Sequence, residues 1–263
     1  MKSVFCAAAA AAGLLLPACA MADPINQTSY YSLTGGQMVT FDDLAGGFVN
    51  GGVGVDYDGV VVDNGVAFAE RFKGQTLSYN GNFDVLSGNP TGPLTLVAGA
   101  PNQNLNIFTE ISSNVLAPDG PVGYPNDDGI GEGAVSFLFS TDQSQFGFQL
   151  VGGNGGDATV SFYANDGSLL QSITLTNLSS AAYGFETDGG LKDVRGVSIT
   201  NVDPYGIALD NLKYDVPSDI GAGPPTGANG GVPEPASWAL MLLGFGGLGA
   251  TLRSARRRGA LMA

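Results

Sequence analysis

The chain has 263 residues and is strongly acidic, with 10 Lys and Arg residues against 24 Asp and Glu. Five of the basic residues lie in the two terminal segments, so the stretch from Asp23 to Pro235 carries a net charge of −19. Such a charge repels phosphate backbones, which argues against nucleic acid as a partner. The chain has no histidine, and its two cysteines, Cys6 and Cys19, lie near its start. The rest of the chain therefore lacks the residues for a Ser-His-Asp or Cys-His catalytic set and for the usual zinc sites.

The N-terminal segment has the three parts of a secretory signal peptide. Lys2 precedes an apolar run from Val4 to Leu16, and small residues follow it up to Ala22. We expect residues 1–22 to be removed, because the apolar run is too short to span a bilayer comfortably. The stretch from Leu16 to Cys19 also resembles a lipobox, although Pro17 departs from that pattern, so a lipid-modified Cys19 is an alternative.

Residues 23–216 are dominated by apolar residues that alternate with polar ones. Val135, Phe137 and Phe139 alternate in one run, and Phe146, Phe148 and Leu150 alternate in the next. The turn Asn165-Asp166-Gly167 separates two further runs and predicts a hairpin. Short period-two runs divided by Gly, Asn and Asp predict an all-β domain, an antiparallel jelly-roll-like β-sandwich over residues 23–216. Residues 217–231 are rich in Gly and Pro without apolar periodicity, which predicts a disordered linker.

The C-terminal segment combines three elements in a fixed order. Pro233-Glu234-Pro235 precedes Trp238 and an uncharged stretch over residues 236–252, and a group of arginines that includes Arg256, Arg257 and Arg258 follows. This order predicts one transmembrane helix over residues 236–252 with its basic end in the cytoplasm. Seventeen residues are close to the minimum length for a span, and glycines weaken it as a helix, which favours a transient anchor over a permanent one.

Residues 232–258 resemble the PEP-CTERM sorting domain in its PEPxxWA form. The resemblance is carried by Pro233, Glu234, Pro235, Trp238 and the arginines Arg256, Arg257 and Arg258. It implies export by the general secretory route of a Gram-negative bacterium and transient insertion into the inner membrane. It also implies recognition and cleavage by an exosortase, so that the protein is secreted or reaches the cell surface.

One strand near the end of the domain breaks its own alternation. Ile207 and Leu209 are out of phase with Leu212 and Tyr214, which predicts a β-bulge at Asp210-Asn211. The strand pattern resembles the jelly-roll domains common in PEP-CTERM proteins, which are in turn similar to carbohydrate-binding modules. In that architecture a late-strand aspartate helps to hold structural calcium. The resemblance therefore implies a Ca²⁺ ligand at Asp210, with Asp42 and Asp43 as companions; the alternative is a bulge aspartate that bonds backbone amides.

Three further motifs are explained by turns and loops. Asp56-Tyr57-Asp58-Gly59 and Asn126-Asp127-Asp128-Gly129 resemble fragments of calcium loops but lack the closing Glu at the right distance, so Asx turns account for both. The glycine-rich segment from Gly152 to Asp157 is a single copy of a motif that binds calcium only in stacked repeats, and it predicts a loop between two strands.

Two functions from different classes fit the sequence. The first is a non-catalytic surface or extracellular-matrix protein whose sandwich associates with extracellular polysaccharide. The alternative is a secreted carbohydrate-active hydrolase that uses two carboxylates, with candidates Glu70, Glu110, Glu132 and Glu186.

Overall fold

The computed structural model of the protein describes residues 24–47, 54–110 and 112–214. The chain divides into two units, Met1–Ser218 and Asp219–Ala263, and the second lies wholly outside the described residues. The predicted signal peptide, linker and transmembrane helix also lie outside them. Within the described ranges, no helix is long and apolar enough to cross a membrane.

The first sheet has eight strands in the order β1-β16-β13-β18-β11-β10-β3, with β2 paired to β18 beside that path. Its strands are β1 (Ile25–Thr28), β2 (Gln37–Val39), β3 (Val55–Tyr57), β10 (Leu105–Glu110), β11 (Ser113–Pro118), β13 (Gln145–Gly152), β16 (Ala181–Thr187) and β18 (Ile207–Tyr214). We call it the larger sheet.

The second sheet has six strands in the order β15-β14-β17-β12-β5-β4. Its strands are β4 (Val61–Asp63), β5 (Val66–Ala69), β12 (Val135–Gln143), β14 (Ala158–Tyr163), β15 (Leu169–Leu175) and β17 (Val194–Asn201). The remaining strands form two small two-stranded sheets. One pairs β6 (Arg71–Phe72) with β9 (Leu96–Val97), and the other pairs β7 (Thr76–Asn80) with β8 (Phe83–Ser87). The helical elements among the described residues are short 3₁₀ turns: η1 (Tyr30–Ser32), η2 (Asp127–Gly129) and η3 (Asp188–Gly190).

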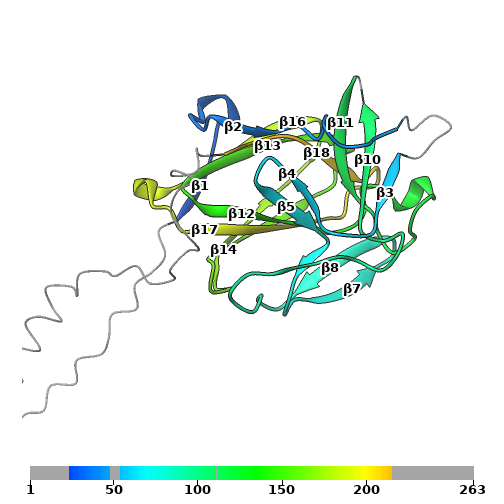
Figure 1. Ribbon diagram of the computed structural model, residues 1–263, viewed down its shortest axis with the longest axis horizontal. Coiled ribbons are helices and arrows are strands. Elements are labelled where there is room, and N and C mark those ends of the chain that lie inside the picture. The colour runs from blue at the N-terminus through cyan, green and yellow to red at the C-terminus, as the bar shows by residue number, and fades with distance from the viewer. Residues whose placement is uncertain (1–23, 48–53, 111, 215–263) are drawn as a thin grey trace, which may run out of the picture. The chain divides into compact units, whose positions relative to one another are not determined.

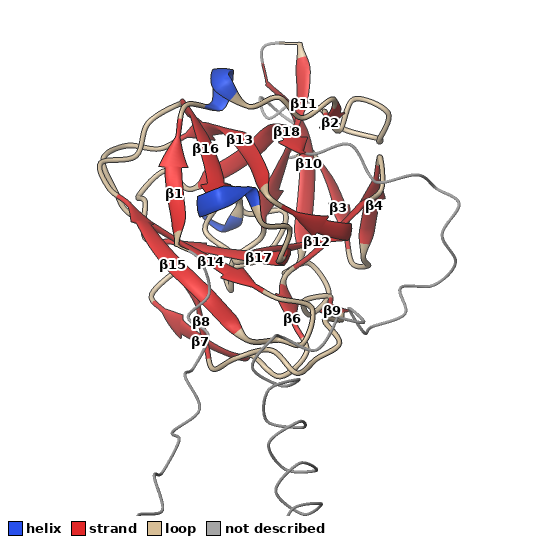
Figure 2. Ribbon diagram, turned by 90° about the vertical axis from the view of Figure 1, so that its left-hand side faces the viewer, coloured by secondary structure: helices blue, strands red, loops and turns tan. Residues whose placement is uncertain are grey.

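The two main sheets pack face to face, as the two views in Figures 1 and 2 show, with β13 and β18 in one layer and β12, β14 and β17 in the other. This packing explains the alternation in the sequence, because the residues at every second position of a strand point into one aromatic core. Phe146 of the larger sheet contacts Phe137 and Phe162 of the second sheet, with ring centroids 6.3 and 5.8 Å apart. The predicted all-β sandwich is confirmed for the described residues, and so is the hairpin at Asn165-Asp166-Gly167, which joins β14 to β15.

The predicted bulge in β18 is also confirmed. Asn211 has a φ of +47°, and the pairing of β13 with β18 shifts register between Gly147 and Gln149. The extra residue reverses the phase of the strand, so that even-numbered residues face the core after the bulge. As a result, Leu209 and Tyr214 are both buried although their sequence parity differs.

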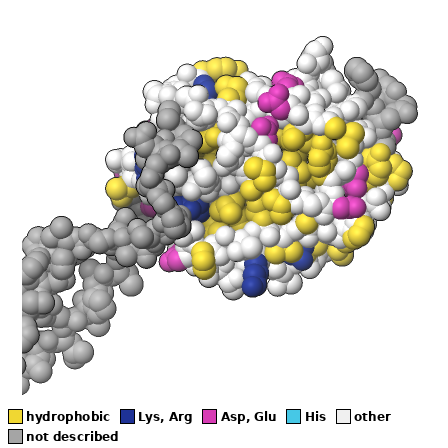
Figure 3. Space-filling view, in the orientation of Figure 1, with side chains coloured by type: hydrophobic (Ala, Val, Ile, Leu, Met, Phe, Trp, Pro, Cys, Tyr) yellow, Lys and Arg dark blue, Asp and Glu magenta, His cyan; other side chains and the backbone are white. Residues whose placement is uncertain are grey.

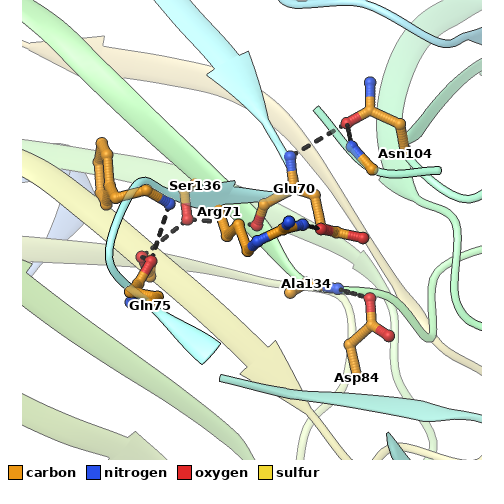
Figure 4. Close-up of polar contacts among 10 residues, drawn as sticks. Glu70, Arg71, Gln75, Asp84, Asn104, Ala134 and Ser136 are labelled. Carbon is orange, nitrogen blue, oxygen red and sulfur yellow. Dashed lines mark hydrogen bonds and ion pairs between the residues drawn. The ribbon is translucent and has the colours of Figure 1, made fainter. Parts of the chain in front are cut away.

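A buried polar network lies where β5 and β6 meet β12 (Figure 4). Glu70 forms an ion pair with Arg71, and its backbone N–H donates to Asn104 Oδ1 at 3.1 Å. Ser136 Oγ donates to the Glu70 carbonyl oxygen at 3.3 Å. The Glu70 carboxylate is therefore buried and paired with Arg71, while the Glu70 backbone joins the neighbouring segments.

Candidate functional site

A cavity of about 520 Å³ opens on the face of the larger sheet that points away from the aromatic core. On three neighbouring strands, Leu116, Leu150 and Leu209 point into the core. Their sequence neighbours Ala117, Val151 and Ala208 point to the other face and line the cavity, together with Phe108 of β10. Two of these floor residues are buried alanines, and their small side chains leave room for the cavity above the sheet. The alternation of the strands therefore builds the apolar floor.

The rim of the cavity comes from two loops, which contain Ile130 and Tyr205. The loops contact one another through the backbone, because the N–H of Ile207 donates to the Gly131 carbonyl oxygen at 2.8 Å. Gly206, with a φ of +63°, allows this approach, since a Cβ there would stand 2.7 Å from the Gly131 backbone. Tyr205 is 75% exposed and lines the mouth of the cavity.

Asp203 holds the turn that carries Tyr205. This carboxylate is fully buried and accepts backbone N–H groups from Asn154 at 2.7 and 2.8 Å, from Gly156 at 2.8 Å and from Tyr205 at 3.0 Å. It thereby joins the turn to the glycine-rich loop between β13 and β14. That loop is the one predicted from the sequence, but neither Asp203 nor Tyr205 was predicted as a site residue.

The cavity is acidic. Glu110, Asp127, Asp128 and Glu132 line it, and no Lys or Arg is among the described residues of its lining. Glu132 is only 6% exposed, and its Oε2 has no hydrogen-bond partner. Burial, and to a lesser extent the charge of Asp128, raises the pKa of Glu132 to about 7. At neutral pH this side chain therefore exchanges between a proton donor and a proton acceptor.

Two of the four candidate hydrolase residues come together here. Glu110 and Glu132 both line the cavity, although they lie on different segments. Glu70 is instead paired with Arg71 in the buried network, and Glu186 is exposed on β16.

The predicted calcium residues are partly brought together. Ser113 Oγ donates to Asp210 Oδ2 at 3.2 Å and to Asp42 Oδ1 at 3.5 Å, and Asp42 and Asp43 are both exposed. The donor atoms are oxygens, as calcium requires. Both oxygens of Asp210 nevertheless accept hydrogen bonds from Asn211, at 2.7 and 2.9 Å, which is what a bulge aspartate without a metal would do. In the part of the chain that the structure describes, no three acidic side chains are placed to hold a metal ion. Calcium at Asp210 thus stays a prediction.

Comparison with known proteins adds one assignment. Residues 231–258 match the model of the PEP-CTERM protein-sorting motif, which contains Pro233, Glu234, Pro235, Trp238 and the three terminal arginines predicted above. This motif implies recognition by an exosortase and export to the cell surface or beyond it. The residues themselves lie outside the described ranges. Among curated proteins, none matches the chain.

Two solved structures show a distant likeness. One is CsCBM6-3 from Clostridium stercorarium in complex with cellobiose, at 13% identity and a TM-score of 0.28, over 44% of this chain and 84% of that one. The other is the enzymatically active domain of tailspike protein 4 of bacteriophage CBA120, at 15% identity and a TM-score of 0.26, over 42% of this chain and 17% of that one. These TM-scores are too low to support an inference about this chain.

Proposed function

We propose that this chain, a PEP-CTERM protein with a β-sandwich domain, is sorted by an exosortase after transient insertion into the inner membrane, and then binds extracellular polysaccharide without catalysis. The sorting motif supports the route. The acidic cavity with Tyr205 at its mouth is the observation that supports a polysaccharide as the ligand.

The cavity suits one or two sugar units. Its volume of about 520 Å³ falls within the range usual for small-ligand sites, and its apolar floor is joined by a few polar groups, as such sites require. An exposed tyrosine packs its ring against the C–H face of a pyranose and keeps its hydroxyl in water. The carboxylates accept hydrogen bonds from sugar hydroxyls.

The charge of the cavity restricts the class of sugar. Four carboxylates without a basic side chain would repel uronic acids and sulfated sugars. Neutral sugars avoid that repulsion, and amino sugars gain an attraction. On the face drawn in Figure 3, acidic side chains lie beside hydrophobic ones, and a few Lys and Arg side chains lie on the same face. We therefore propose neutral or amino-sugar polymers as the ligand.

Calorimetric titration of the full chain with three oligosaccharides tests this proposal: a neutral glucan, a chitosan and a polyuronate. The glucan or the chitosan should bind, and the polyuronate should not. Tyr205→Ala should weaken binding about tenfold or more, the loss typical of a central aromatic contact. The matched control is Tyr31→Ala, since Tyr31 is equally exposed, at 79%, but belongs to η1 and does not line the cavity. Equal affinities for the two variants would contradict the assignment of the cavity.

The second candidate function is hydrolysis of the same polymer. It is favoured by Glu132, whose pKa of about 7 is that of a general acid near neutral pH, and by Glu110 or Asp128 as the second carboxylate. Release of reducing ends from the bound polymer by the full chain, abolished in Glu132→Gln, would establish it. If the concentrated protein binds the polymer but releases no reducing ends over several hours, the result would support the non-catalytic binding function.

A further inference from the structure

Asp119, the residue after β11, is the most unusual acidic group among the described residues. Its side chain is fully buried, and its carboxyl oxygens contact the carboxyl group of Asp56 but accept no hydrogen bond from an N–H or hydroxyl group. An uncompensated buried carboxylate is costly, so such groups bind a proton, a partner cation or a metal. The ion pairs of Arg71 with Glu70 and of Arg195 with Asp142 do not involve Asp119.

The pairing of the strands places Asp119 beside two further acids. Asp56 of β3 lies opposite Asn106 of β10, which lies opposite Ala117 of β11, so these residues share one face of the sheet. Asp119 is the next residue of the chain on that face, because side chains alternate along a strand. Asp56 Oδ1 also lacks a hydrogen-bond partner.

The electrostatics agree with this placement. The pKa of Asp119 is raised to about 8, first by burial and then by the neighbouring carboxyls of Asp56 and Asp58. Burial and Asp58 likewise raise the pKa of Asp56. The three acids therefore destabilise one another when they are charged, and a cation between them would remove that repulsion.

We propose that Asp119 and Asp56 bind a divalent cation of the calcium or magnesium class at this end of β11. Asp58 adds charge rather than a ligand atom, because no three acidic side chains of the described ranges are placed to hold a metal together. Calcium takes six to eight oxygens and completes its shell with amide oxygens, carbonyl oxygens and water, whereas magnesium often uses only one or two carboxylates. Asn106, between the two strands in the register, offers an amide on the same face.

The site differs from the one expected at Asp210. Ser113, which contacts Asp210 and Asp42, begins β11, and Asp119 follows its end. The site also accounts for the sequence Asp56-Tyr57-Asp58-Gly59. This motif has two acids of a cation loop but no closing acid nearby in the sequence, and Asp119, directly after β11, supplies the missing carboxylate.

The test is calorimetric titration of the chelator-treated full chain with CaCl₂ and with MgCl₂, together with thermal unfolding. We expect the wild type to bind one of these ions and to unfold at a higher temperature in its presence. Asp119→Asn should weaken binding at least about tenfold, the minimum loss known even for residues that only support a ligand. Asp56→Asn should do the same. Asp166→Asn, in an exposed turn, is the matched control and should bind as the wild type does.

Asp119→Asn also distinguishes the two explanations for this buried acid, a bound cation and a bound proton. The variant replaces a buried acid, which without a cation is mostly protonated at neutral pH, by a neutral amide of similar size, so in chelator it should unfold close to the temperature of the wild type, which shows that it folds. If the wild type binds neither ion, Asp119 is simply a protonated acid and the proposal is wrong. Binding that is unchanged in Asp119→Asn but lost in Asp210→Asn would likewise overturn it.

Discussion

The Oδ2 atom of Asp84 accepts a hydrogen bond from the backbone N–H of Ala134 at 2.9 Å (Figure 4). The Asp84 N–H in turn donates to the Glu132 carbonyl oxygen at 3.2 Å. These two bonds attach β8 to the segment that forms one wall of the cavity. Asp84 is only 2% exposed, and burial raises its pKa to about 6, although the Ala134 N–H and the charge of Arg71 oppose the shift.

The first prediction is a loss of stability with rising pH that depends on Asp84. In the folded protein Asp84 keeps its proton up to about pH 6, whereas an unfolded Asp releases it near pH 4. The folded state therefore binds more protons between these values, and the free energy of unfolding falls as the pH rises. The contribution amounts to about 3 kcal/mol, at about 1.4 kcal/mol for each pKa unit.

Urea unfolding of the wild type and of Asp84→Asn at pH 4, 5, 6 and 7 measures this contribution. Asn keeps an oxygen for the Ala134 N–H but does not titrate, so the difference between the two proteins should vary with pH by the amount above. Asp188→Asn, at an exposed position, is the control for the change of carboxylate to amide. A constant difference between the wild type and Asp84→Asn across this range would show that Asp84 is charged throughout.

The second prediction concerns Asp203, which positions Tyr205 without itself lining the cavity. Asp203→Ala leaves the backbone N–H groups of Asn154, Gly156 and Tyr205 without their acceptor, which should lower the free energy of unfolding by about 2–4 kcal/mol. The turn that presents Tyr205 should loosen at the same time. Oligosaccharide affinity should therefore fall nearly as far as in Tyr205→Ala, although the tyrosine is still present.

Comparison of the two variants by urea unfolding and calorimetry separates the effects. Tyr205→Ala should lose affinity with little change in stability, because its side chain is 75% exposed. Asp203→Ala should lose both. If Asp203→Ala kept wild-type affinity, the position of Tyr205 would not depend on this carboxylate.

The sequence predicted the parts of the fold that depend on local patterns. Phe137, Phe146 and Phe162 alternate with polar residues because one side of each strand faces the core, and this periodicity is visible without a structure. The bulge at Asp210-Asn211 was also predictable, since a single extra residue reverses the phase of the strand.

The cavity was not predictable, because its features come from distant segments. Ala117 and Ala208 look like ordinary strand residues, and they form the floor of a cavity only because loops from elsewhere in the chain build its walls around them. Asp119 shows no unusual pattern in the sequence either. Its burial beside Asp56 depends on the order of β3, β10 and β11 in the sheet. One part of the cavity could have been suspected from the sequence. The segment Asp203-Pro204-Tyr205-Gly206 places an aromatic residue in a turn between two strands.

The third prediction is the calcium site at Asp210 that the jelly-roll resemblance implies. If it exists, Asp210→Asn should lower the number of calcium ions bound to the full chain by one, and should reduce the drop in melting temperature caused by a chelator. Asp42→Asn should have the same effect, because both carboxylates contact Ser113. Asp43→Asn should have less effect, because the side-chain bonds of Ser113 in the described structure go to Asp42 and Asp210. An unchanged number of bound ions in Asp210→Asn would leave Asp210 as a bulge residue that bonds Asn211.

The last prediction concerns the sorting motif at residues 231–258. An uncharged stretch that ends in several arginines is held in the inner membrane with those arginines in the cytoplasm, so the chain can leave only if the motif is cut on the outer side. Mass spectrometry of the protein from the cell surface or medium should therefore find a chain that ends near Pro233-Glu234-Pro235 and lacks Arg256, Arg257 and Arg258. Replacing Glu234 by Ala should leave the uncut chain in the membrane fraction, whereas Asp219→Ala, outside the motif, should be cut normally. Recovery of Arg256 to Arg258 in the released wild-type protein would exclude cleavage at this motif.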